Sequence, residues 1–413
     1  MAGKLARLLG YAALSLSMGF VGPAGHAQQA LAPQLESGPQ SEVPVAIQML
    51  RWRMNDADIN SLTFRNMDTL FTTRKVPRSG PVWRLERADR PLDFTYAHDG
   101  RSYTPEQFLD RTYTDALLVM KDGRIVYENY RNNSDERTRF MGWSMTKSLV
   151  SLMVGVALEE GRIESLDDPI DRYLAELKGG GYEGVTIRQI LQMRSGVDYE
   201  ERYDFANPGI AASNHINALV KNVSRFADPA RTIERAHAPG ETFAYKTIDT
   251  AVLGWLLERV TGTTVSAFMA RALWEPLGAE QDGFFIMDGP PGVGREFTGA
   301  GFNATLRDYA RVGLMMLDGG KANGRQVVPA EWVVLSTLPT TDSSRRERDG
   351  YGMQWWTFGE TAYSAVGLQG QFIYVDPATR TVVVKLSHFP PGDDAPSAET
   401  AAFMAAASAW RPR

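Results

Sequence analysis

Hydrophobic and polar positions follow two different periods along the chain, and these periods separate strand regions from helix regions. The residues Thr114–Tyr130 contain two runs rich in β-branched and aromatic side chains on either side of Lys121-Asp122-Gly123, which predicts a hairpin with a glycine-containing turn. Strand-forming runs return at 351–358, 371–376 and 381–387, and the four residues between the last two predict a second hairpin.

Helical patterns fill the region between these strands. Ser144–Glu160 is apolar on almost every side, which predicts a buried central helix. Thr186 and Gln189 have the spacing of a capping box, and the helix they begin is expected to stop at Gly196. Further helices are predicted to end at Gly262 and Gly278, to span Thr305–Gly320, to begin at Pro329 and to span 396–410.

This order of elements predicts an α+β fold. One antiparallel sheet would be built from both ends of the chain, and an all-helical region at about 160–340 would be inserted between them to give an α/β sandwich. We expect one domain over residues 44–413. Residues 44–113 have mixed composition and many turn formers, so their pattern assigns no element.

The first residues have the layout of a secretory signal peptide. Lys4 and Arg7 precede an apolar stretch from Leu8 to Val21, and small residues follow up to Ala27. We therefore expect a signal peptide at 1–27, then a linker rich in Gln, Pro, Ser and Ala at 28–43. Later segments stay below the ~18 apolar residues of a spanning helix. The mature protein is expected to be periplasmic or secreted, without a stable membrane anchor.

Composition excludes several classes of function. The chain has 413 residues, of which 43% are hydrophobic and 23% charged, as in an ordinary globular protein. Its formal net charge is −5 and it has no long basic run, which weighs against nucleic acid as a partner. It has no cysteine, so disulfides, thiol catalysis and cysteine-based metal sites are excluded.

The start of the apolar helix carries the candidate chemistry. Ser144 and Lys147 are three residues apart, so both side chains lie on one face of the helix. Burial would lower the pKa of the lysine, and a neutral lysine can accept the serine proton without histidine. The helix N-terminus adds free amides that can donate to an oxyanion. The alternative is an ordinary helix start, with Ser144 as the N-cap and Lys147 solvated.

Three motifs in one order resemble a known enzyme superfamily. "SMTK" (144–147), "YKT" (245–247) and "AVGLQGQFIYVDP" (365–377) are similar to the Ser-x-x-Lys, Tyr-x-Asn and Lys-Thr-Gly regions of serine β-lactamases and penicillin-binding proteins. Within that superfamily the chain resembles class C-like esterases and, most closely, 6-aminohexanoate-dimer (nylon-oligomer) hydrolases. The resemblance covers about residues 114–410 and implies a β-lactamase/transpeptidase-like fold.

The resemblance also implies roles for individual residues. Ser144 would be the nucleophile, Lys147 its general base and Tyr245 the proton relay to the leaving group. The backbone amides of Ser144 and Leu368 would form the oxyanion hole. The implied activity is an exported serine hydrolase that cleaves carboxylic ester or linear amide bonds of a small molecule through an acyl-enzyme on Ser144. The resemblance is also compatible with a homodimer.

Two departures from the superfamily pattern weigh against β-lactamase or D-alanyl peptidase activity. Ala365-Val366-Gly367 stands where β-lactamases have Lys-Thr-Gly, so the cation that would grip a β-lactam carboxylate is missing. Thr247 stands where the Asn of the second motif is expected.

Candidate substrate contacts are harder to choose from sequence. Residues 199–209 form an acidic and aromatic loop that could cover the site, and Tyr203 is its candidate contact. Thr247 and Gly367 belong to the motifs themselves. Trp355 and Trp356 alternate across a predicted strand, so only one can face the site, and Trp356 is the candidate. Core packing explains Tyr203 and the two tryptophans equally well.

Three other functions remain open at this point. An α/β-hydrolase would use Ser144 with a histidine such as His388, but the chain lacks the repeated strand–helix alternation of that fold. A metallohydrolase would need paired ligands such as His-x-x-x-His, which are absent, so no metal and no cofactor are expected. A non-catalytic peptidoglycan-binding homologue would keep the fold without turnover.

Overall fold

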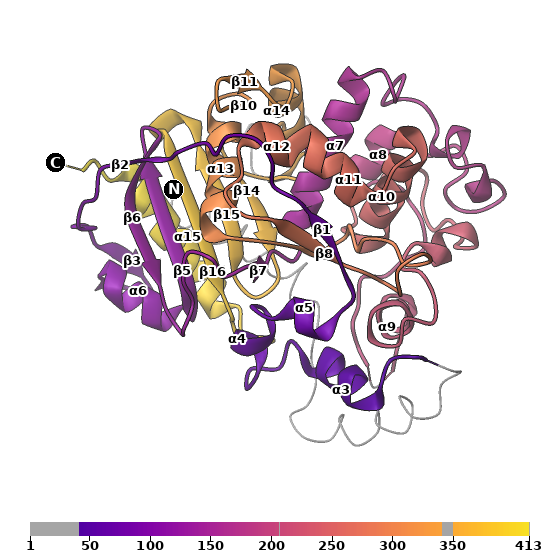
Figure 1. The fold of residues 1–413 in the computed structure, drawn as a ribbon, viewed down its shortest axis with the longest axis horizontal. Helices are drawn as coiled ribbons and strands as arrows, with labels where there is room; N and C mark the ends of the chain where they lie inside the picture. Colours follow the sequence, from indigo (N-terminus) through magenta and orange to yellow (C-terminus); the bar gives the residue numbers. More distant parts are fainter. Residues whose placement is uncertain (1–40, 206, 341–349, 413) are drawn as a thin grey trace.

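The structure, a computed structural model, describes residues 41–205, 207–340 and 350–412. Its largest element is an eight-stranded sheet (Figure 1). In spatial order the strands are β12 (Gly350–Tyr351), β13 (Trp356–Phe358), β14 (Ala362–Gly367), β15 (Gln371–Asp376), β16 (Thr381–Ser387), β5 (Thr114–Lys121), β6 (Arg124–Tyr130) and β2 (Glu86–Arg87).

Strands from both ends of the chain meet at the centre of this sheet. β16 pairs antiparallel with β5, with Val383 opposite Val119, and every other pairing in the sheet is antiparallel except that of the short β2 with β6. The predicted α+β fold, with one antiparallel sheet built from both chain ends, is therefore confirmed.

Helices cover both faces of the sheet. On one face α15 (Ala395–Ala409) and α6 (Pro105–Arg111) pack together, and the rings of Phe108 and Phe403 stack with centroids 3.9 Å apart. On the other face lie α13 (Leu306–Leu317) and α7 (Met145–Glu159). The buried side chains of β5 alternate between these layers, since Leu117 and Val119 join the α15 side while Leu118 and Met120 join the α7 side.

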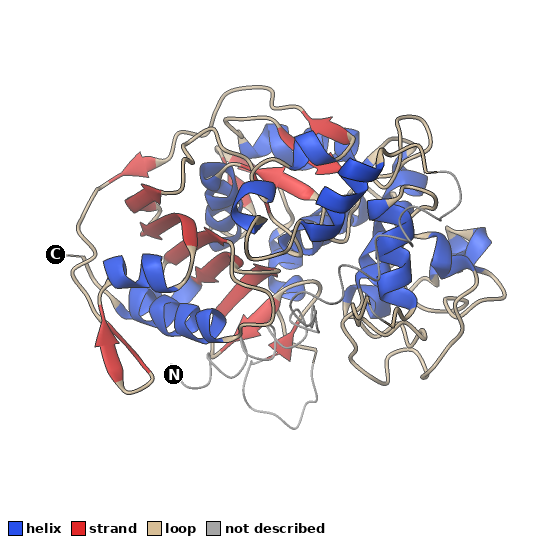
Figure 2. Ribbon diagram, turned by 90° about the horizontal axis from the view of Figure 1, so that it is seen from below, coloured by secondary structure: helices blue, strands red, loops and turns tan. Residues whose placement is uncertain are grey.

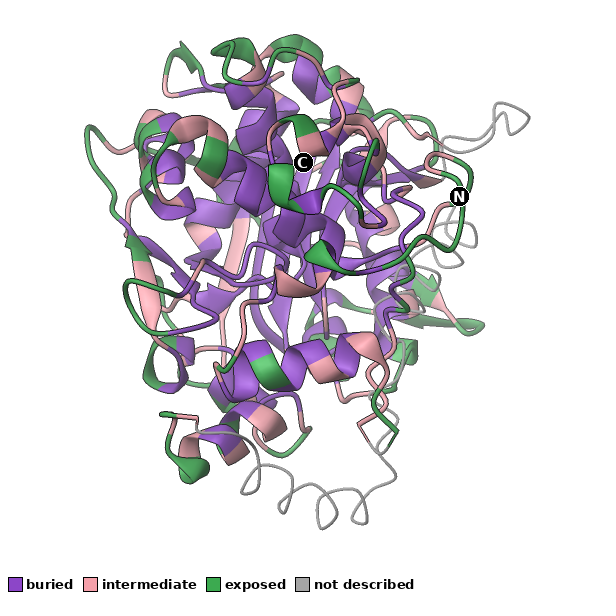
Figure 3. Cartoon of the chain, turned by 90° about the vertical axis from the view of Figure 1, so that its right-hand side faces the viewer, coloured by how far each residue is buried: buried purple, intermediate pink, exposed green. Residues whose placement is uncertain are grey.

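The helix α7 is the buried central helix that the apolar pattern predicts. Its residues from Met145 to Ala157 are all buried. Figure 3 shows that buried residues fill the interior of the molecule, while exposed residues lie at its surface. The glycine at 155 allows another helix to approach, because a Cβ there would lie 2.4 Å from the ring of Trp332 on α14 (Ala330–Ser336). A helix enclosed on all sides holds its first turn in a fixed place, which matters for the site below.

The helical region beside the sheet is shown in Figure 2. Its α-helices are α8 (Ile187–Leu191), α9 (Ile210–His215), α10 (Thr247–Thr261), α11 (Val265–Met269) and α12 (Glu275–Leu277). Further helical segments of 3-10 or π type are η1 (Ile170–Arg172), η2 (Ala175–Leu177), η3 (Ile216–Val220), η4 (Asp228–Arg231) and η5 (Ala270–Trp274). The predicted capping box at Thr186 and Gln189 is present, and Gly262 and Gly278 end their helices in the left-handed conformation.

The inserted region differs from the prediction in two ways. It contains β8 (Gly283–Ile286) and β9 (Phe302–Ala304), which join β1 (Thr73–Val76) and β7 (Phe140–Met141) in a second sheet of order β1-β8-β9-β7. These strands have two to four residues, too few for a period of two to stand out. The helix α8 also ends well before Gly196.

The predicted strand at 351–358 is also interrupted. Residues 352–355 separate β12 from β13, and at Gly352 a Cβ would lie 2.2 Å from the carbonyl oxygen of Ser336. The close approach of the chain after α14 therefore breaks the strand at this glycine. The remaining small elements are β10 (Lys321–Ala322), β11 (Arg325–Gln326) and the turn η6 (Pro377–Thr379).

Residues 44–113, which no pattern assigned, form a strap that supplies an edge strand to each of the two larger sheets, β1 and β2. The strap contains α3 (Val45–Arg53), α4 (Asn60–Thr63), α5 (Met67–Leu70) and the hairpin of β3 (Tyr96–His98) and β4 (Arg101–Tyr103). Its carbonyl groups hold two loops of the site: the amide of Met141 donates to the Phe64 oxygen at 2.8 Å, and the Gln369 side chain donates to the Asn55 oxygen at 2.9 Å.

The predicted signal peptide at 1–27 and most of the predicted linker at 28–43 lie outside the described residues. Within the part of the chain that the structure describes, no helix is both long and apolar enough to cross a membrane.

Candidate active site

Ser144 lies immediately before α7, but it does not cap the helix. Its side chain makes no capping hydrogen bond, and its backbone is already helical, with φ −67° and ψ −5°. The preceding residue, Trp143, has a φ of +48°, a conformation that costs about 1–3 kcal/mol in a residue with a bulky side chain. Packing holds Trp143 in place, with its ring 5.2 Å from that of Phe64. The interpretation of Ser144 as an ordinary N-cap is therefore wrong.

Lys147 is buried against Ser144. Its Nζ lies 3.0 Å from Ser144 Oγ, 3.2 Å from Thr247 Oγ1 and 2.7 Å from the Gly299 carbonyl oxygen. The side chain is only 1% exposed, and loss of hydration lowers its pKa to about 7, while the charge of Glu201 acts in the opposite direction. A solvated lysine is thus excluded, and the amine is poised to exchange a proton with the serine near neutral pH.

Gly299 is needed for this arrangement. A Cβ at this position would lie 2.3 Å from Thr247 Cγ2. The chain therefore passes close enough to α10 for its carbonyl to reach Lys147 only because residue 299 has no side chain.

Tyr245 completes a compact group with Ser144 and Lys147. The Tyr245 ring centroid is 4.9 Å from Lys147 Nζ. Burial raises the pKa of the Tyr245 phenol, and a hydrogen bond with Ser144 opposes that shift. The Tyr245 ring stacks on that of Trp356, with centroids 5.9 Å apart, and meets Tyr351 edge-on. The structure therefore brings all three residues of the predicted catalytic group together.

The end of β14 reaches the residues just before the serine. At Gly367 an added Cβ would lie 2.3 Å from the Gly142 carbonyl oxygen and 3.1 Å from Trp143 Cβ. Leu368 follows in the turn to β15. Within the described residues, neither the Ser144 amide nor the Leu368 amide has an acceptor outside regular secondary structure. The two amides predicted for the oxyanion hole thus lie on neighbouring segments.

The strand β14 offers no cation to this site. Ala365 is fully buried on the α7 side of the sheet, and Val366 is buried on the α15 side. The position that carries lysine in β-lactamases is therefore occupied here by a methyl group within the core.

The loop at 199–209 contributes a residue that the sequence motifs did not indicate. Glu201 is 7% exposed and accepts hydrogen bonds from the Thr247 amide at 2.8 Å, the Thr247 hydroxyl and the Tyr203 hydroxyl at 2.6 Å. Tyr203 is thus tied to Glu201, and Thr247 links Glu201 to Lys147. The sequence indicated an acidic and aromatic loop at these positions, but no pattern in it distinguished Glu201 from its neighbour Glu200.

The two tryptophans of 351–358 lie in different environments, but Trp355 precedes β13, so alternation along one strand is not the reason. Trp356 packs against Tyr245, whereas Trp355 is fully buried and meets the ring of Tyr363 edge-on. Trp356 is therefore the one that borders the candidate catalytic group.

The structure does not support the α/β-hydrolase alternative. The main sheet is antiparallel apart from one short edge pairing, and that fold requires parallel strands. His388 pairs through Nδ1 with Asp115 Oδ2 at 2.9 Å, while Ser144 has Lys147 as its partner. His215 is buried beside the rings of Tyr203 and Phe205, where desolvation lowers its pKa to about 4.

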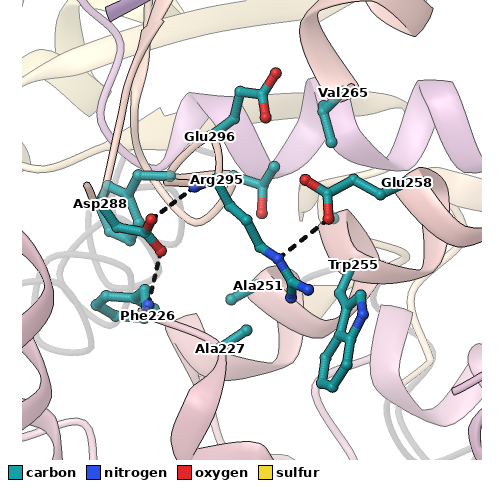
Figure 4. Close-up of a pocket in the computed structure, with 12 residues that line it drawn as sticks. Phe226, Ala227, Ala251, Trp255, Glu258, Val265, Asp288, Arg295 and Glu296 are labelled. Atoms are coloured by element: carbon teal, nitrogen blue, oxygen red, sulfur yellow. Dashed lines mark hydrogen bonds and ion pairs between the residues drawn. The ribbon is translucent and has the colours of Figure 1, made fainter. Parts of the chain in front are cut away.

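The described residues contain no group of three or more histidine, aspartate or glutamate side chains placed to hold a metal ion. A separate small pocket lies behind the segment 295–299 (Figure 4). It is lined by ion-paired and apolar side chains, including the pair of Arg295 and Glu258 at 3.2 Å, and Thr298 separates it from the carbonyl that faces Lys147. It holds no hydroxyl paired with a base, so it offers no second nucleophile.

Comparison with known proteins identifies the family. The model of the family described as Beta-lactamase matches residues 105–407, which include the whole main sheet except β2 and every residue of the group around Ser144. The chain belongs to the Beta-lactamase family. This is consistent with a serine hydrolase whose base is the lysine one turn along the same helix.

Individual relatives narrow the comparison. The chain is 35% identical to the 6-aminohexanoate-dimer hydrolase of Paenarthrobacter ureafaciens over 353 residues, which are 82% of this chain and 88% of the relative. A Bacillus anthracis structure provisionally named as a 6-aminohexanoate-dimer hydrolase superposes with a TM-score of 0.74 at 24% identity, covering 87% of this chain and 93% of the other. A family VIII carboxylesterase superposes with a TM-score of 0.55 at 18% identity, covering 72% and 94%. The protein is therefore a serine hydrolase of the β-lactamase superfamily.

Proposed function

We propose that this hydrolase cleaves carboxylic ester or linear amide bonds of small molecules through an acyl-enzyme on Ser144, in the manner of a 6-aminohexanoate-dimer hydrolase. The observation that carries the proposal is the buried pair in which Lys147 Nζ lies 3.0 Å from Ser144 Oγ. A lysine with a pKa of about 7 is partly neutral at physiological pH, so it can act as the general base.

The first half of the reaction forms the acyl-enzyme. Ser144 Oγ attacks the carbonyl carbon while its proton passes to Lys147, and the oxyanion that develops is stabilised by the amides of Ser144 and Leu368. The carbon–leaving group bond then breaks as the Tyr245 hydroxyl protonates the leaving group. Lys147 returns the proton that Tyr245 has lost, so both groups end in their starting forms.

The second half releases the acid. A water molecule attacks the acyl carbonyl and gives one proton to the tyrosine–lysine pair, and the same amides stabilise the second oxyanion. When the ester bond breaks, Ser144 Oγ regains that proton. The products are the free carboxylic acid and the unchanged enzyme.

The choice of substrate class rests on what is absent from β14 and on the relatives. A β-lactam or a peptide ending in D-alanine carries a carboxylate, and the chain has Ala365 where β-lactamases place a lysine to bind it. The relative that is 35% identical is named for a linear amide dimer, and one structural neighbour is a carboxylesterase. Both names support the hydrolysis of ester or linear amide bonds rather than of β-lactam rings.

The proposal is tested on a panel of substrates. Purified protein is assayed with p-nitrophenyl acetate and butyrate, a linear 6-aminohexanoate dimer, nitrocefin and a D-alanyl peptide. We expect ester or linear-amide turnover that is lost in Ser144→Ala and Lys147→Ala while both variants keep their circular dichroism spectra. Undiminished turnover in Ser144→Ala would refute the mechanism, and dominant nitrocefin turnover would favour a β-lactamase.

Lys385 provides a control that distinguishes the loss of a general base from the loss of a buried amine. Lys385 is also fully buried with its pKa lowered by desolvation, but its Nζ contacts the Thr112 carbonyl and Ser387 on the α15 side of the sheet. Lys385→Met should therefore keep kcat even if it alters stability.

A non-catalytic peptidoglycan-binding homologue would instead show no turnover and no reaction of Ser144 with a fluorophosphonate.

We also propose that the mature protein is exported and begins near Gln28. The support is the charged and apolar layout of residues 1–27. Expression with a periplasmic fraction and N-terminal sequencing would check it, since a cytoplasmic protein that retains residues 1–27 would contradict export. Light scattering of the same sample would show whether it is a monomer or the homodimer that the family resemblance allows.

A further inference from the structure

A chain of polar contacts continues beyond Lys147 to a buried carboxylate. Lys147 Nζ lies 3.2 Å from Thr247 Oγ1, and that hydroxyl donates its proton to Glu201. The Thr247 amide donates to the second oxygen of the same carboxylate at 2.8 Å. Thr247 is therefore held by two bonds to Glu201, and its remaining lone pairs face the lysine.

The single proton of the Thr247 hydroxyl decides which group donates in each of these hydrogen bonds. A threonine hydroxyl has one proton, and when it is donated to a carboxylate, the oxygen can only accept from the lysine. The contact thus requires Lys147 to donate a hydrogen to Thr247. The Gly299 carbonyl at 2.7 Å also accepts from Lys147, so two of its three possible hydrogens have fixed acceptors and the third position faces Ser144 Oγ at 3.0 Å.

The burial of Glu201 strengthens the effect of its charge on Lys147. Its side chain is 7% exposed, and its three donors are Tyr203 and the two groups of Thr247. In a partly dehydrated site the effective dielectric is well below that of water, so a charge two hydrogen bonds away is felt strongly. The titratable groups that interact with Glu201 or lie beside it are Lys147 on α7, Tyr245, Lys246 and Asp249 around the start of α10, and Tyr199 and Tyr203 on its own loop.

We infer that Glu201 is a positioning residue for the proposed reaction, which orients the Lys147 amine through Thr247 and stabilises the ammonium that forms when Ser144 gives up its proton. This inference rests on the proposed function of Ser144 and Lys147. It assigns Glu201 and the residues around it a role in proton transfer, and it explains why threonine can replace the asparagine of the superfamily motif.

During acylation Lys147 changes from neutral to positive while it is fully buried, which is costly unless a negative charge is nearby. The carboxylate of Glu201 is present before the reaction begins, so it favours the charged form without reorganisation. The same charge raises the pKa of Lys147 in the resting enzyme. Glu201 therefore lowers the fraction of Lys147 that is neutral and able to act as a base, while it stabilises the ammonium that forms.

The test is the pH dependence of Glu201→Gln. The amide keeps the shape and one acceptor but removes the charge, so the Lys147 pKa should fall and the acidic limb of kcat/KM for p-nitrophenyl acetate should move down by about one pH unit. On the alkaline plateau kcat should fall about tenfold, since a less basic amine is a weaker proton acceptor. KM should change little, because Glu201 acts through Lys147.

Four further variants separate this role from a structural one. Thr247→Ser keeps the hydroxyl and should retain the wild-type profile, whereas Thr247→Val removes the hydroxyl that orients the amine but leaves the Glu201 charge, so it should lower kcat and move the limb less than Glu201→Gln does. Glu200→Gln is the matched loop control, since Glu200 is exposed and pairs with Arg202 at 3.2 Å, and it should leave the profile in place. Asp249→Asn should also leave the limb in place, although burial raises the Asp249 pKa to about 6.

Two results would overturn the inference. One is a Glu201→Gln profile that coincides with wild type while Ser144→Ala remains inactive, which would leave the proposed function standing and remove the role of Glu201. The other is a limb that moves in Asp249→Asn and not in Glu201→Gln. If Ser144→Ala instead retains turnover, the proposed function itself is wrong, and the pH data on Glu201 are not needed to show it.

Discussion

Replacing Gly367 by alanine should separate the two halves of the proposed oxyanion hole. An added Cβ would lie 2.3 Å from the Gly142 carbonyl oxygen, whereas real Cβ contacts stay above 3.0 Å. The end of β14 and the segment before Ser144 must therefore move apart by at least about 0.7 Å, and neither is a flexible side chain that could turn away.

The size of the effect on catalysis follows from the movement of the Leu368 amide. Leu368 is the next residue, so its amide moves with the strand. A misplacement of about 1 Å costs on the order of 10²-fold in rate, and loss of one oxyanion donor costs about 10²–10³-fold. We therefore expect kcat/KM for p-nitrophenyl acetate to fall about 10²-fold. Overpacking of this kind should also cost about 1–3 kcal/mol of the free energy of unfolding.

The control is a second glycine in a crowded place that is remote from the oxyanion hole. On α13 a Cβ at Gly313 would lie 2.6 Å from Val382 Cγ1 on the α7 side of the main sheet. Gly313→Ala should lose stability in urea denaturation but keep kcat within about twofold. A Gly367→Ala enzyme that folds and retains near wild-type kcat/KM would refute the assignment of the Leu368 amide.

Three further predictions follow from the same geometry. In Lys147→Met the free energy of unfolding should exceed that of the wild type most at and below pH 7, because the folded pKa of Lys147, about 7, is below the unfolded value. The wild type regains about 1.4 kcal/mol per pH unit as the pH rises from 7 toward the unfolded pKa of about 10.4, and a difference that stays constant in pH-dependent urea curves would contradict this. Tyr245→Phe keeps the stack on Trp356 but loses the proton relay, so kcat should fall at least about 10²-fold with KM little changed in steady-state assays, and a wild-type kcat would exclude the relay. Trp52→Ala removes the edge contact with Phe205, whose centroid is 4.2 Å away, so the loop at 199–209 should loosen and KM should rise by roughly fivefold, which unchanged KM would contradict.

The contribution of the strap at 44–113 could not be predicted from its sequence. Arg51 is an example: it is buried beneath Phe71, and its guanidinium donates to the carbonyl of Leu70 at 2.7 Å and to Asn222 Oδ1 at 2.7 Å. An arginine in a segment whose pattern assigns no element is expected at the surface. Only the arrival of a segment 171 residues away converts it into a buried connection between the strap and the helical region.

Local patterns were sufficient where the physical cause is local. The capping box at Thr186, the glycines that end helices at 262 and 278 and the hairpin at Lys121-Asp122-Gly123 depend on residues within one or two turns. The apolar helix at 144–160 is also readable, because a helix with no polar face must be buried. The Ser144–Lys147 pair belongs to this class, since its spacing on the helix follows from helix geometry alone.

The chemistry of that pair depends on contacts that no local pattern encodes. Whether Lys147 is solvated or buried is decided by Thr247 and Gly299, which lie 100 and 152 residues further along the chain. The choice of Glu201 over Glu200 is decided by which carboxylate the fold turns toward the start of α10. The sequence by itself thus predicted Ser144 as the nucleophile and indicated its helix and the family. The tertiary structure decided the pKa of the base and the carboxylate behind it, because desolvation and charge are properties of the packed surroundings of a residue.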